Sequence, residues 1–371
     1  MRSRPALLLV PFVALSCMPE ARDSITDPAS PQAAQIDGLW TFALWLGIAV
    51  WVAVMVLLAI PVLRSRRRGS SDVNRDLTRS DGQDPADRDT PVRAPGAVMD
   101  EPLTTADPNA HDEAQRDHRA RSRLLWIGGI IGPAIILVVL LIYNGQVASS
   151  VAHTEQDDEL IIDVHGHMFW WEVHYPEQDI TTANEIHVPV DQPVRLRLTT
   201  EDVIHSFWIP RVHGKIDMIP GTENWLSFEA TETGRFRGQC AEFCGIAHAQ
   251  MVKFLEVQEP EEFDAWVENQ QQPADEPDTA QTAQGQRVFF ESGCAACHTV
   301  TGTDAIGGVG PDLTHLASRG SLASGIVPNT RQNLADLIVE PWRVKPGNPM
   351  PPTVLDDDDL DALLDYLESL E

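Results

Sequence analysis

Residues 238–251 have the sequence Gly238-Gln239-Cys240-Ala241-Glu242-Phe243-Cys244-Gly245-Ile246-Ala247-His248-Ala249-Gln250-Met251, which places two thiols, one imidazole and one thioether in a single short segment. A second imidazole, His205, lies upstream in Val203-Ile204-His205-Ser206-Phe207. Thiolate and thioether ligands are soft and select copper, and imidazole also suits this metal. The pattern therefore predicts a copper site in a loop.

The number of donors indicates how many metal ions this segment holds. Two cysteines so close together, with only two histidines and one methionine, can serve a pair of coppers, in which each thiolate bridges both metals. Each histidine then binds one metal, and the thioether and one backbone carbonyl are weak outer ligands. Structural zinc is the alternative, because two Cys and two His can form a tetrahedral site, although zinc has no use for the thioether. The predicted ligands are His205, Cys240, Glu242 (through its backbone carbonyl), Cys244, His248 and Met251.

The residues around this segment favour a β-sandwich or small barrel over residues 152–258. Short runs in which apolar and polar residues alternate are typical of half-buried strands, and turn residues separate them here. The expected strands are at Leu160–Val164, Glu185–Val188, Val194–Leu198, Trp225–Phe228 and Val252–Val257.

Two uncharged apolar runs, residues 38–63 and 124–147, precede this domain. Each is long enough to cross a bilayer, which takes roughly 20 apolar residues, whereas core helices of a soluble domain are the alternative. Arginines gather at both ends of the intervening residues 64–123, so the positive-inside rule places this segment in the cytoplasm and the rest of the chain outside. Its Asp, Arg, Pro and Gly content predicts little order.

Residues 1–17 resemble a secretory signal, with Arg2 and Arg4 before an apolar run. The run ends at Ser16-Cys17, as in a bacterial lipoprotein signal, which predicts lipidation of Cys17. Ala14 departs from the usual leucine of such a signal, so a cysteine placed there by chance is the alternative.

A second cofactor motif is Cys294-Ala295-Ala296-Cys297-His298, which has the spacing of covalent c-type haem attachment. Both thiols can form thioethers, while His298 binds the iron. The sixth ligand is expected to be Met350, in a proline-rich loop, with His315 as the competing residue. A redox thiol pair or zinc site is the alternative to haem. Helical patterning dominates residues 285–371, and residues 259–284, which include an expected helix at 261–269, form the predicted linker.

The charge of the chain is concentrated in its second part. The net charge is -28, and 39 acidic against 12 basic residues lie from Ala152 onward, compared with 16 against 15 before it. This balance argues against nucleic-acid binding and favours either basic protein partners or simple solubility.

The Cys240–Met251 loop resembles the binuclear copper (CuA) motif of cytochrome c oxidase subunit II, and the resemblance extends over roughly residues 39–257. It implies a cupredoxin-like fold, a magnesium ion bound by the Glu242 side chain and shared with subunit I, and an aromatic patch that receives electrons. That patch is matched by Phe169, Trp170 and Trp171, so these are the candidate relay residues.

Residues 285–371 resemble a class I cytochrome c. In that family a proline after the haem motif supports the proximal histidine, a role that falls to Pro311 here. The resemblance also makes Arg319 and Trp342 candidate neighbours of the haem propionates.

The sequence thus predicts a multidomain membrane protein with a two-helix transmembrane hairpin, a cupredoxin-like all-β domain and a C-terminal all-α cytochrome c domain. Its expected function is that of subunit II of a terminal cytochrome c oxidase in the bacterial plasma (inner) membrane. A soluble cytochrome c would donate electrons, and subunit I, beside subunit III, would reduce oxygen to water with proton translocation. The alternatives are the corresponding subunit of a nitric oxide reductase and a free-standing copper chaperone or electron carrier.

Overall fold

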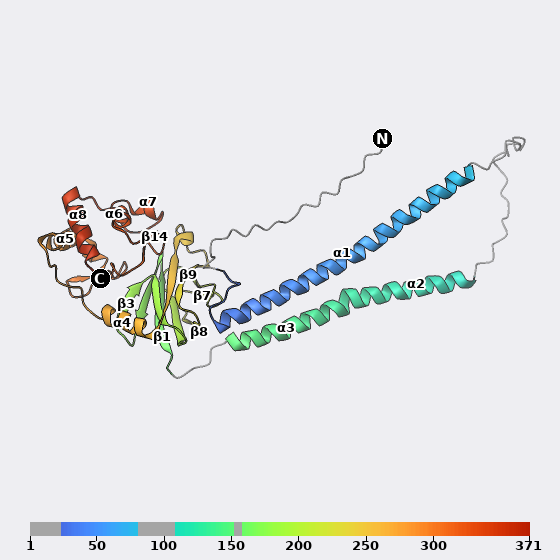
Figure 1. Cartoon of the computed structure of the whole chain (residues 1–371), viewed down its shortest axis with the longest axis horizontal. Helices are drawn as coiled ribbons and strands as arrows, with labels where there is room; N and C mark the ends of the chain where they lie inside the picture. The colour runs from blue at the N-terminus through green and yellow to red at the C-terminus, as the bar shows by residue number, and fades with distance from the viewer. Residues whose placement is uncertain (1–23, 81–107, 152–157) are drawn as a thin grey trace, which may run out of the picture. The chain divides into compact units, whose positions relative to one another are not determined.

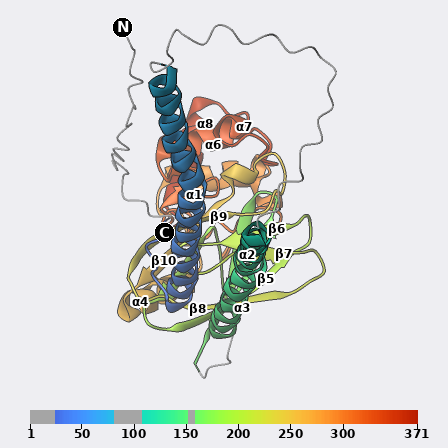
Figure 2. The same ribbon diagram turned by 90° about the vertical axis from the view of Figure 1, so that its right-hand side faces the viewer.

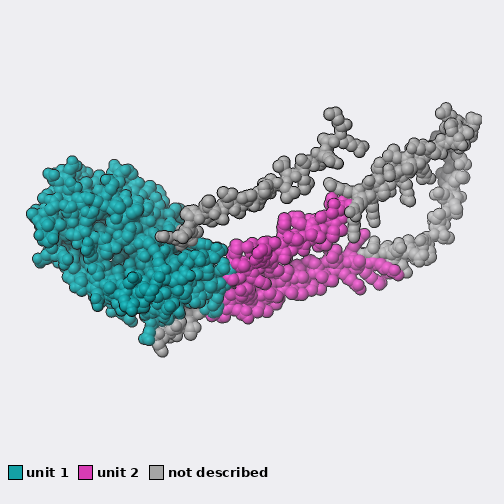
Figure 3. Space-filling view, viewed as in Figure 1, with its two compact units in different colours: residues 1–37, 150–371 teal, residues 38–149 magenta. Residues whose placement is uncertain are grey.

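The computed structural model describes residues 24–80, 108–151 and 158–371. It divides into two compact units, one containing Gly38–Ser149 and the other the residues up to Asp37 together with Ser150–Glu371 (Figure 3). The predicted signal segment, with Cys17, lies outside the described residues.

The apolar runs form the expected long helices. Helix α1 spans Pro31–Ser80, and the second run is made of α2 (Pro108–Trp126), a π-helical turn (Ile127–Ile131) and α3 (Gly132–Val151). The segments Pro31–Leu63 and His118–Val151 are long and apolar enough to cross a membrane. Phe42 and Tyr143 meet edge to face, with ring centroids 5.4 Å apart.

Part of the segment predicted to lack order is helical. Helix α1 continues past residue 63 to Ser80, and α2 already begins at Pro108. A helix that has started adds further residues at little cost, since the unfavourable step is nucleation. Composition alone therefore underestimated how far the two helices extend.

The β-sandwich domain (residues 160–270) contains two five-stranded sheets (Figure 1). The first has the order β3-β2-β1-β5-β8 and the second β4-β10-β9-β6-β7. Alternate residues of most strands are buried between the sheets, as the sequence pattern predicts. The strands are β1 Leu160–His167, β2 Trp170–Tyr175, β3 Ile180–Ala183, β4 Glu185–Pro189, β5 Pro193–Thr200, β6 His205–Trp208, β7 Ile216–Met218, β8 Asn224–Glu229, β9 Gly234–Cys240 and β10 Val252–Gln258.

Two further segments complete this domain. Helix α4 (Pro260–Gln270) buries Phe263 and stacks Trp266 on His187, so it belongs to the sandwich, although the sequence assigned it to the linker. Ala29, ahead of α1, is also part of the core: its amide donates to the Arg211 carbonyl at 2.7 Å.

The helical domain (residues 280–371) holds the remaining helices, which lie close together in Figures 1 and 2. Helix α5 begins five residues before the predicted boundary at Gly285, because Thr279 caps its first turn. Gly285 instead allows α5 to approach α8, since a Cβ there would lie 1.9 Å from the Ala362 carbonyl oxygen. Two short hairpins in this domain were not predicted: β11 (Thr299–Val300) pairs with β12 (Ala305–Ile306), and β13 (Ser321–Leu322) pairs with β14 (Val327–Pro328). The helices are α5 Ala280–Glu291, α6 Arg331–Val339, α7 Pro341–Val344 and α8 Asp357–Glu368, with a 3-10 turn at Cys294–Ala296.

Candidate copper and haem sites

The loop of residues 240–251 is fixed at both ends by the second sheet. Strands β9 and β10 pair antiparallel with Gln239 opposite Val252, and the Cys240 amide donates to the Met251 carbonyl at 3.0 Å. Strand β6 pairs with β9 on the other side. This pairing brings His205, at the start of β6, to the loop.

All six predicted donors converge. The sulfurs of Cys240 and Cys244 are 3.8 Å apart, and both side chains are buried. Cys240 Sγ lies 3.9 Å from His205 Nδ1 and 3.2 Å from the carbonyl oxygen of Glu242. On the other side, Cys244 Sγ lies 3.7 Å from His248 Nδ1 and 3.9 Å from Met251 Sδ.

These distances suit metal binding. Two sulfurs 3.8 Å apart can both reach a shared ion at a metal–thiolate distance of about 2.3 Å. The contact between the thiols lowers the pKa of Cys240 and raises that of Cys244, and metal binding requires both to lose their protons. Within the described residues, the compact group suited to one ion contains His205, Cys240 and Cys244 without His248. Each histidine lies beside a different sulfur, His205 beside Cys240 and His248 beside Cys244.

Asp202 orients His205, and the sequence did not single it out. Its carboxylate lies 2.9 Å from His205 Nε2 and also accepts from the amide of Met168 at 2.6 Å. Burial raises the pKa of Asp202, but its hydrogen bonds from Val203 N, His205 and Met168 N outweigh this and lower it below the usual value. An aspartate three residues before a candidate histidine ligand was the available signal.

Lys253 was also missed. Its side chain is fully buried, and its amine donates to the Gln239 carbonyl at 3.0 Å. The amine lies 3.9 Å from the ring centroid of Trp171 and 4.3 Å from that of Phe207. Trp171, one of the candidate relay residues, therefore points into the sandwich core, where its ring meets His205 edge to face at 6.0 Å.

The residues of the predicted haem site surround one cavity of about 260 Å³. Both cysteines of the motif line it, together with His298 and Met350. Apolar side chains from α5, α6 and α8 form much of the remaining wall, as a porphyrin ring requires. They include Phe289, Leu334, Leu337, Ile338, Leu363 and Leu367.

His298 is held in one orientation. Its Nδ1 donates to the Pro311 carbonyl at 2.7 Å, which leaves Nε2 as the nitrogen able to bind a metal. Burial lowers the pKa of His298 and so favours the neutral ring. A Cβ at Gly310 would lie 2.6 Å from His298 Cε1, so glycine is required there. The competing His315 has both ring nitrogens engaged, by the carbonyls of Glu371 and Gln272.

Of the two candidate propionate neighbours, only Arg319 is suitably placed. Arg319 lines the cavity, is buried, and has a buried Nε with no hydrogen-bond partner. An unsatisfied guanidinium nitrogen at the cavity wall fits a bound carboxylate. Trp342 is 60% exposed and does not line the cavity, so its place beside a propionate stays a prediction.

The other two relay candidates lie where the β-sandwich meets this cavity. Phe169, in the turn between β1 and β2, is buried and lines the cavity, as does Trp170. Trp170 also stacks on His167, with ring centroids 4.4 Å apart. Within this aromatic segment, Trp171 thus lies beside a copper ligand, and Phe169 and Trp170 line the haem cavity.

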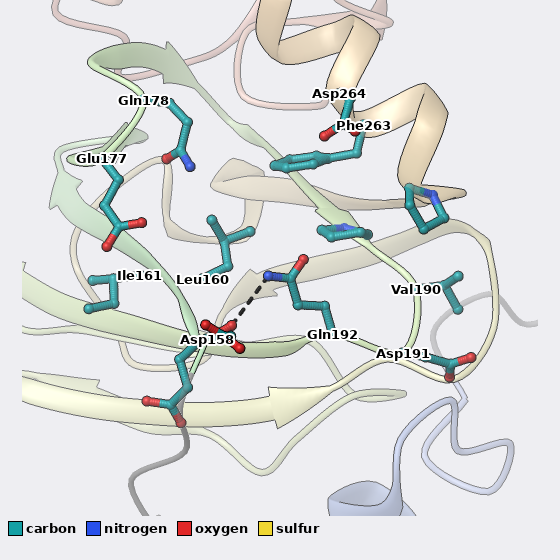
Figure 4. Close-up of a pocket in the computed structure, with 13 residues that line it drawn as sticks. Asp158, Leu160, Ile161, Glu177, Gln178, Val190, Asp191, Gln192, Phe263 and Asp264 are labelled. Carbon is teal, nitrogen blue, oxygen red and sulfur yellow. Dashed lines mark hydrogen bonds between the residues drawn. The ribbon is translucent and has the colours of Figure 1, made fainter.

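A larger hollow, about 890 Å³, opens beside the start of β1 and α4 (Figure 4). It is lined by carboxylates such as Asp158, Glu177 and Asp264, and Gln192 donates to the Asp158 carbonyl there. No predicted site residue lines it, so it takes no part in either site.

The chain combines a membrane anchor, a loop of soft ligands on a cupredoxin-like sandwich, and a cytochrome c fold. This combination defines an electron-transfer subunit of a respiratory complex. Residues 178–257 match the family "Cytochrome C oxidase subunit II, periplasmic domain", and residues 282–371 match "Cytochrome c". Cytochrome c oxidase subunit 2 of Alkalihalophilus pseudofirmus is 38% identical over 245 residues, covering 64% of this chain and 71% of that protein. The Bacillus subtilis subunit 2 is 31% identical over 268 residues, covering 67% and 75%. The periplasmic domain of subunit II of cytochrome oxidase of Bradyrhizobium japonicum aligns with a TM-score of 0.30 and 36% identity, over 32% of this chain and 95% of that one.

The chain belongs to the cytochrome c oxidase subunit 2 family. It is the electron-input subunit of the oxidase, with subunit I as a partner, and its domains are those that carry CuA copper and haem c. The helices and the periplasmic-type domain make it a membrane-anchored subunit with extracytoplasmic domains. The nitric oxide reductase alternative is not favoured by these relatives.

Proposed function

We propose that electrons enter this subunit at the helical domain and leave it at the Cys240–Met251 loop. The observation that carries the proposal is the convergence of both donor sets in one compact unit. Haem c and a binuclear copper, when bound, supply one-electron carriers, so electrons pass without any bond being made or broken.

At the copper loop the residues have distinct roles. Cys240, Cys244, His205 and His248 would be the main ligands of the two copper ions. The Glu242 carbonyl, beside Cys240, and the Met251 thioether, beside Cys244, would be weaker ligands. Asp202 fixes the ring of His205, and the buried setting excludes water, so the ligands keep their positions when the charge of the site changes.

At the haem cavity, Cys294 and Cys297 form the covalent attachment. His298 and Met350 would bind the haem iron, and His/Met ligation raises the potential of a haem. The Pro311 carbonyl holds His298 in the tautomer that can bind a metal, and Arg319 would pair with a carboxylate of the haem.

The wider assignments follow from the family. We infer that the domain limits are those expected from the sequence, except that the β-sandwich domain extends to residue 270 and the cytochrome domain starts at residue 280. The subunit lies in a bacterial plasma membrane, with residues 64–123 in the cytoplasm. Subunit I reduces oxygen to water with proton translocation, subunit III completes the complex, and a soluble cytochrome c is the donor. The side chain of Glu242 binds magnesium shared with subunit I.

Electron paramagnetic resonance of the purified complex, with copper and haem counted per chain, tests the residue assignments. Cys244→Ser should abolish the signal of one electron shared by two coppers and leave the haem signal intact. Cys297→Ser is the matched control, because it should alter haem attachment and leave the copper signal unchanged. A shared-electron signal that survives Cys244→Ser would refute the two-thiolate bridge.

A further inference from the structure

Lys345 joins the two domains through a buried amine. It is one of only three lysines in the chain, and its side chain is 3% exposed. The amine donates to the Phe169 carbonyl of the β-sandwich at 2.6 Å and to the Ala323 carbonyl of the helical domain at 3.2 Å. Lysine is rarely buried unless its amine has partners. These two hydrogen bonds therefore form a defined contact between the β-sandwich and the helical domain.

The surfaces around Lys345 fit closely. A Cβ at Gly347 would lie 2.1 Å from Cγ2 of Ile246, in the copper loop, and one at Gly320 would lie 2.5 Å from Nη1 of Arg235. Glu185, itself buried, accepts hydrogen bonds from the Gly320 amide and from Ser321 Oγ. Ser324 Oγ also donates to the Val252 carbonyl at 2.7 Å. Several hydrogen bonds, two of them to buried groups, thus join the two domains around Lys345.

Phe169 lies at the centre of this interface. Its ring lines the haem cavity, and a Cβ at Gly245, directly after Cys244 in the copper loop, would lie 3.0 Å from the same ring. One aromatic side chain therefore touches both sites. Lys345 holds the backbone of that residue and precedes Met350 by only five positions.

We propose that Lys345 is a positioning residue that locks the helical domain onto the β-sandwich, so that Phe169 bridges the haem cavity and the copper loop. The subunit is then a fixed two-centre relay and not a tethered shuttle. One electron leaves the haem site and one arrives at the copper site, with no transfer of atoms. This inference rests on the proposed function for the identity of the two centres.

The test uses Lys345→Met in the complete oxidase complex in detergent. Removing a buried hydrogen-bond donor and leaving two carbonyls without a partner should raise the undocked fraction by roughly ten- to a hundredfold. Limited proteolysis of the linker at residues 271–279 measures that fraction, with and without copper. Flash reduction of the haem, followed optically, measures its electron transfer to copper, which should slow. The separately measured reduction potentials of the two centres should not change.

Arg343→Met is the matched control. Arg343 lies two positions away, and its ion pairs with Asp336 and Glu340 stay within the helical domain, so neither rate should change. Phe169→Leu keeps the carbonyl that Lys345 binds but removes the aromatic ring. Phe169→Leu should slow electron transfer from haem to copper without increasing proteolytic cleavage of the linker. If Lys345→Met does not fold, this variant alone tests the bridging role of Phe169.

Three results would overturn the inference: an unchanged cleavage rate in Lys345→Met, an unchanged transfer rate in that variant, or an unchanged transfer rate in Phe169→Leu. Failure of the proposed function is distinguishable, because it appears in the unmodified complex as missing haem or copper.

Discussion

Glu256 should make the β-sandwich less stable as the pH rises toward neutrality. It lies on β10, where its carboxylate and that of Glu185 share the guanidinium of Arg235, at 2.6 and 3.0 Å. Burial raises the pKa of Glu256 to about 7; Arg235 opposes this shift and Glu185 adds to it. One guanidinium cannot fully compensate two buried carboxylates, so Glu256 keeps its proton up to a higher pH than a free carboxyl group.

The magnitude follows from the shift. The pKa rises from 4.5 to about 7 on folding, and the side chain is only 17% exposed, so solvent screening is limited. Each pKa unit corresponds to about 1.4 kcal/mol, so the whole shift corresponds to about 3 kcal/mol. The folded state binds more protons than the unfolded state between these two values. The contribution is therefore fully present below pH 4.5 and is lost as the pH rises through about 7.

Urea unfolding of the purified chain at pH 4.5 and pH 8, followed by tryptophan fluorescence, measures the effect. Glu256→Gln removes the titration, so the stability of this variant relative to the unmodified chain should increase by about 3 kcal/mol between the two pH values. Any constant effect of the substitution cancels in that comparison. Glu268→Gln, on an exposed position of α4, should give the same difference at both pH values. A pH-independent difference for Glu256→Gln would refute the reasoning.

Three further predictions concern the two sites. Asp202→Asn should weaken copper binding by roughly ten- to a hundredfold, the usual cost of losing a partner that orients a ligand; competition with a chelator measures this, and unchanged affinity would show that Asp202 does not orient His205. Gly310→Ala should displace His298, because the added carbon would lie 2.6 Å from its ring. The haem should stay attached but change its spin state, whereas Gly308→Ala, where a Cβ would meet nothing within 4 Å, should leave the spectrum unchanged. Met350→Ala should leave the haem attached and lower its reduction potential, and an unchanged potential in redox titration would exclude Met350 as the ligand.

The sequence predicted both donor sets because most of each lies in one short motif. Cys240, Cys244, His248 and Met251 fall within one loop, and their donor chemistry is independent of the fold. His205 was more difficult to assign from the sequence, because it lies outside the loop and only strand pairing places it beside Cys240. Asp202 was not predicted for the same reason: an aspartate three residues before a histidine is common, and only the folded turn between β5 and β6 places its carboxylate beside the ring.

Helix limits were less predictable than donor chemistry. Composition indicated where apolar residues end, at residue 63, but a helix needs no apolar residues to continue, and α1 reaches Ser80. The linker-like composition up to residue 284 predicted a domain boundary at Gly285. The capping Thr279 and the contact of Gly285 with α8 show instead that this glycine lies inside helix α5. A glycine can mark either a break or a close approach, and only the neighbouring chain distinguishes the two.

The contact between the domains had no local signal. Lys345 and Phe169 are 176 positions apart, and neither belongs to a motif that the other completes. The scarcity of lysine was nevertheless informative in retrospect. The chain carries a net charge of -28 and only three lysines, of which Lys253 lies buried beside the copper loop and Lys345 between the domains. Solubility gains nothing from a buried amine, so both positions are explained by what the amine holds: Gln239, directly before Cys240, and Phe169, between the two centres.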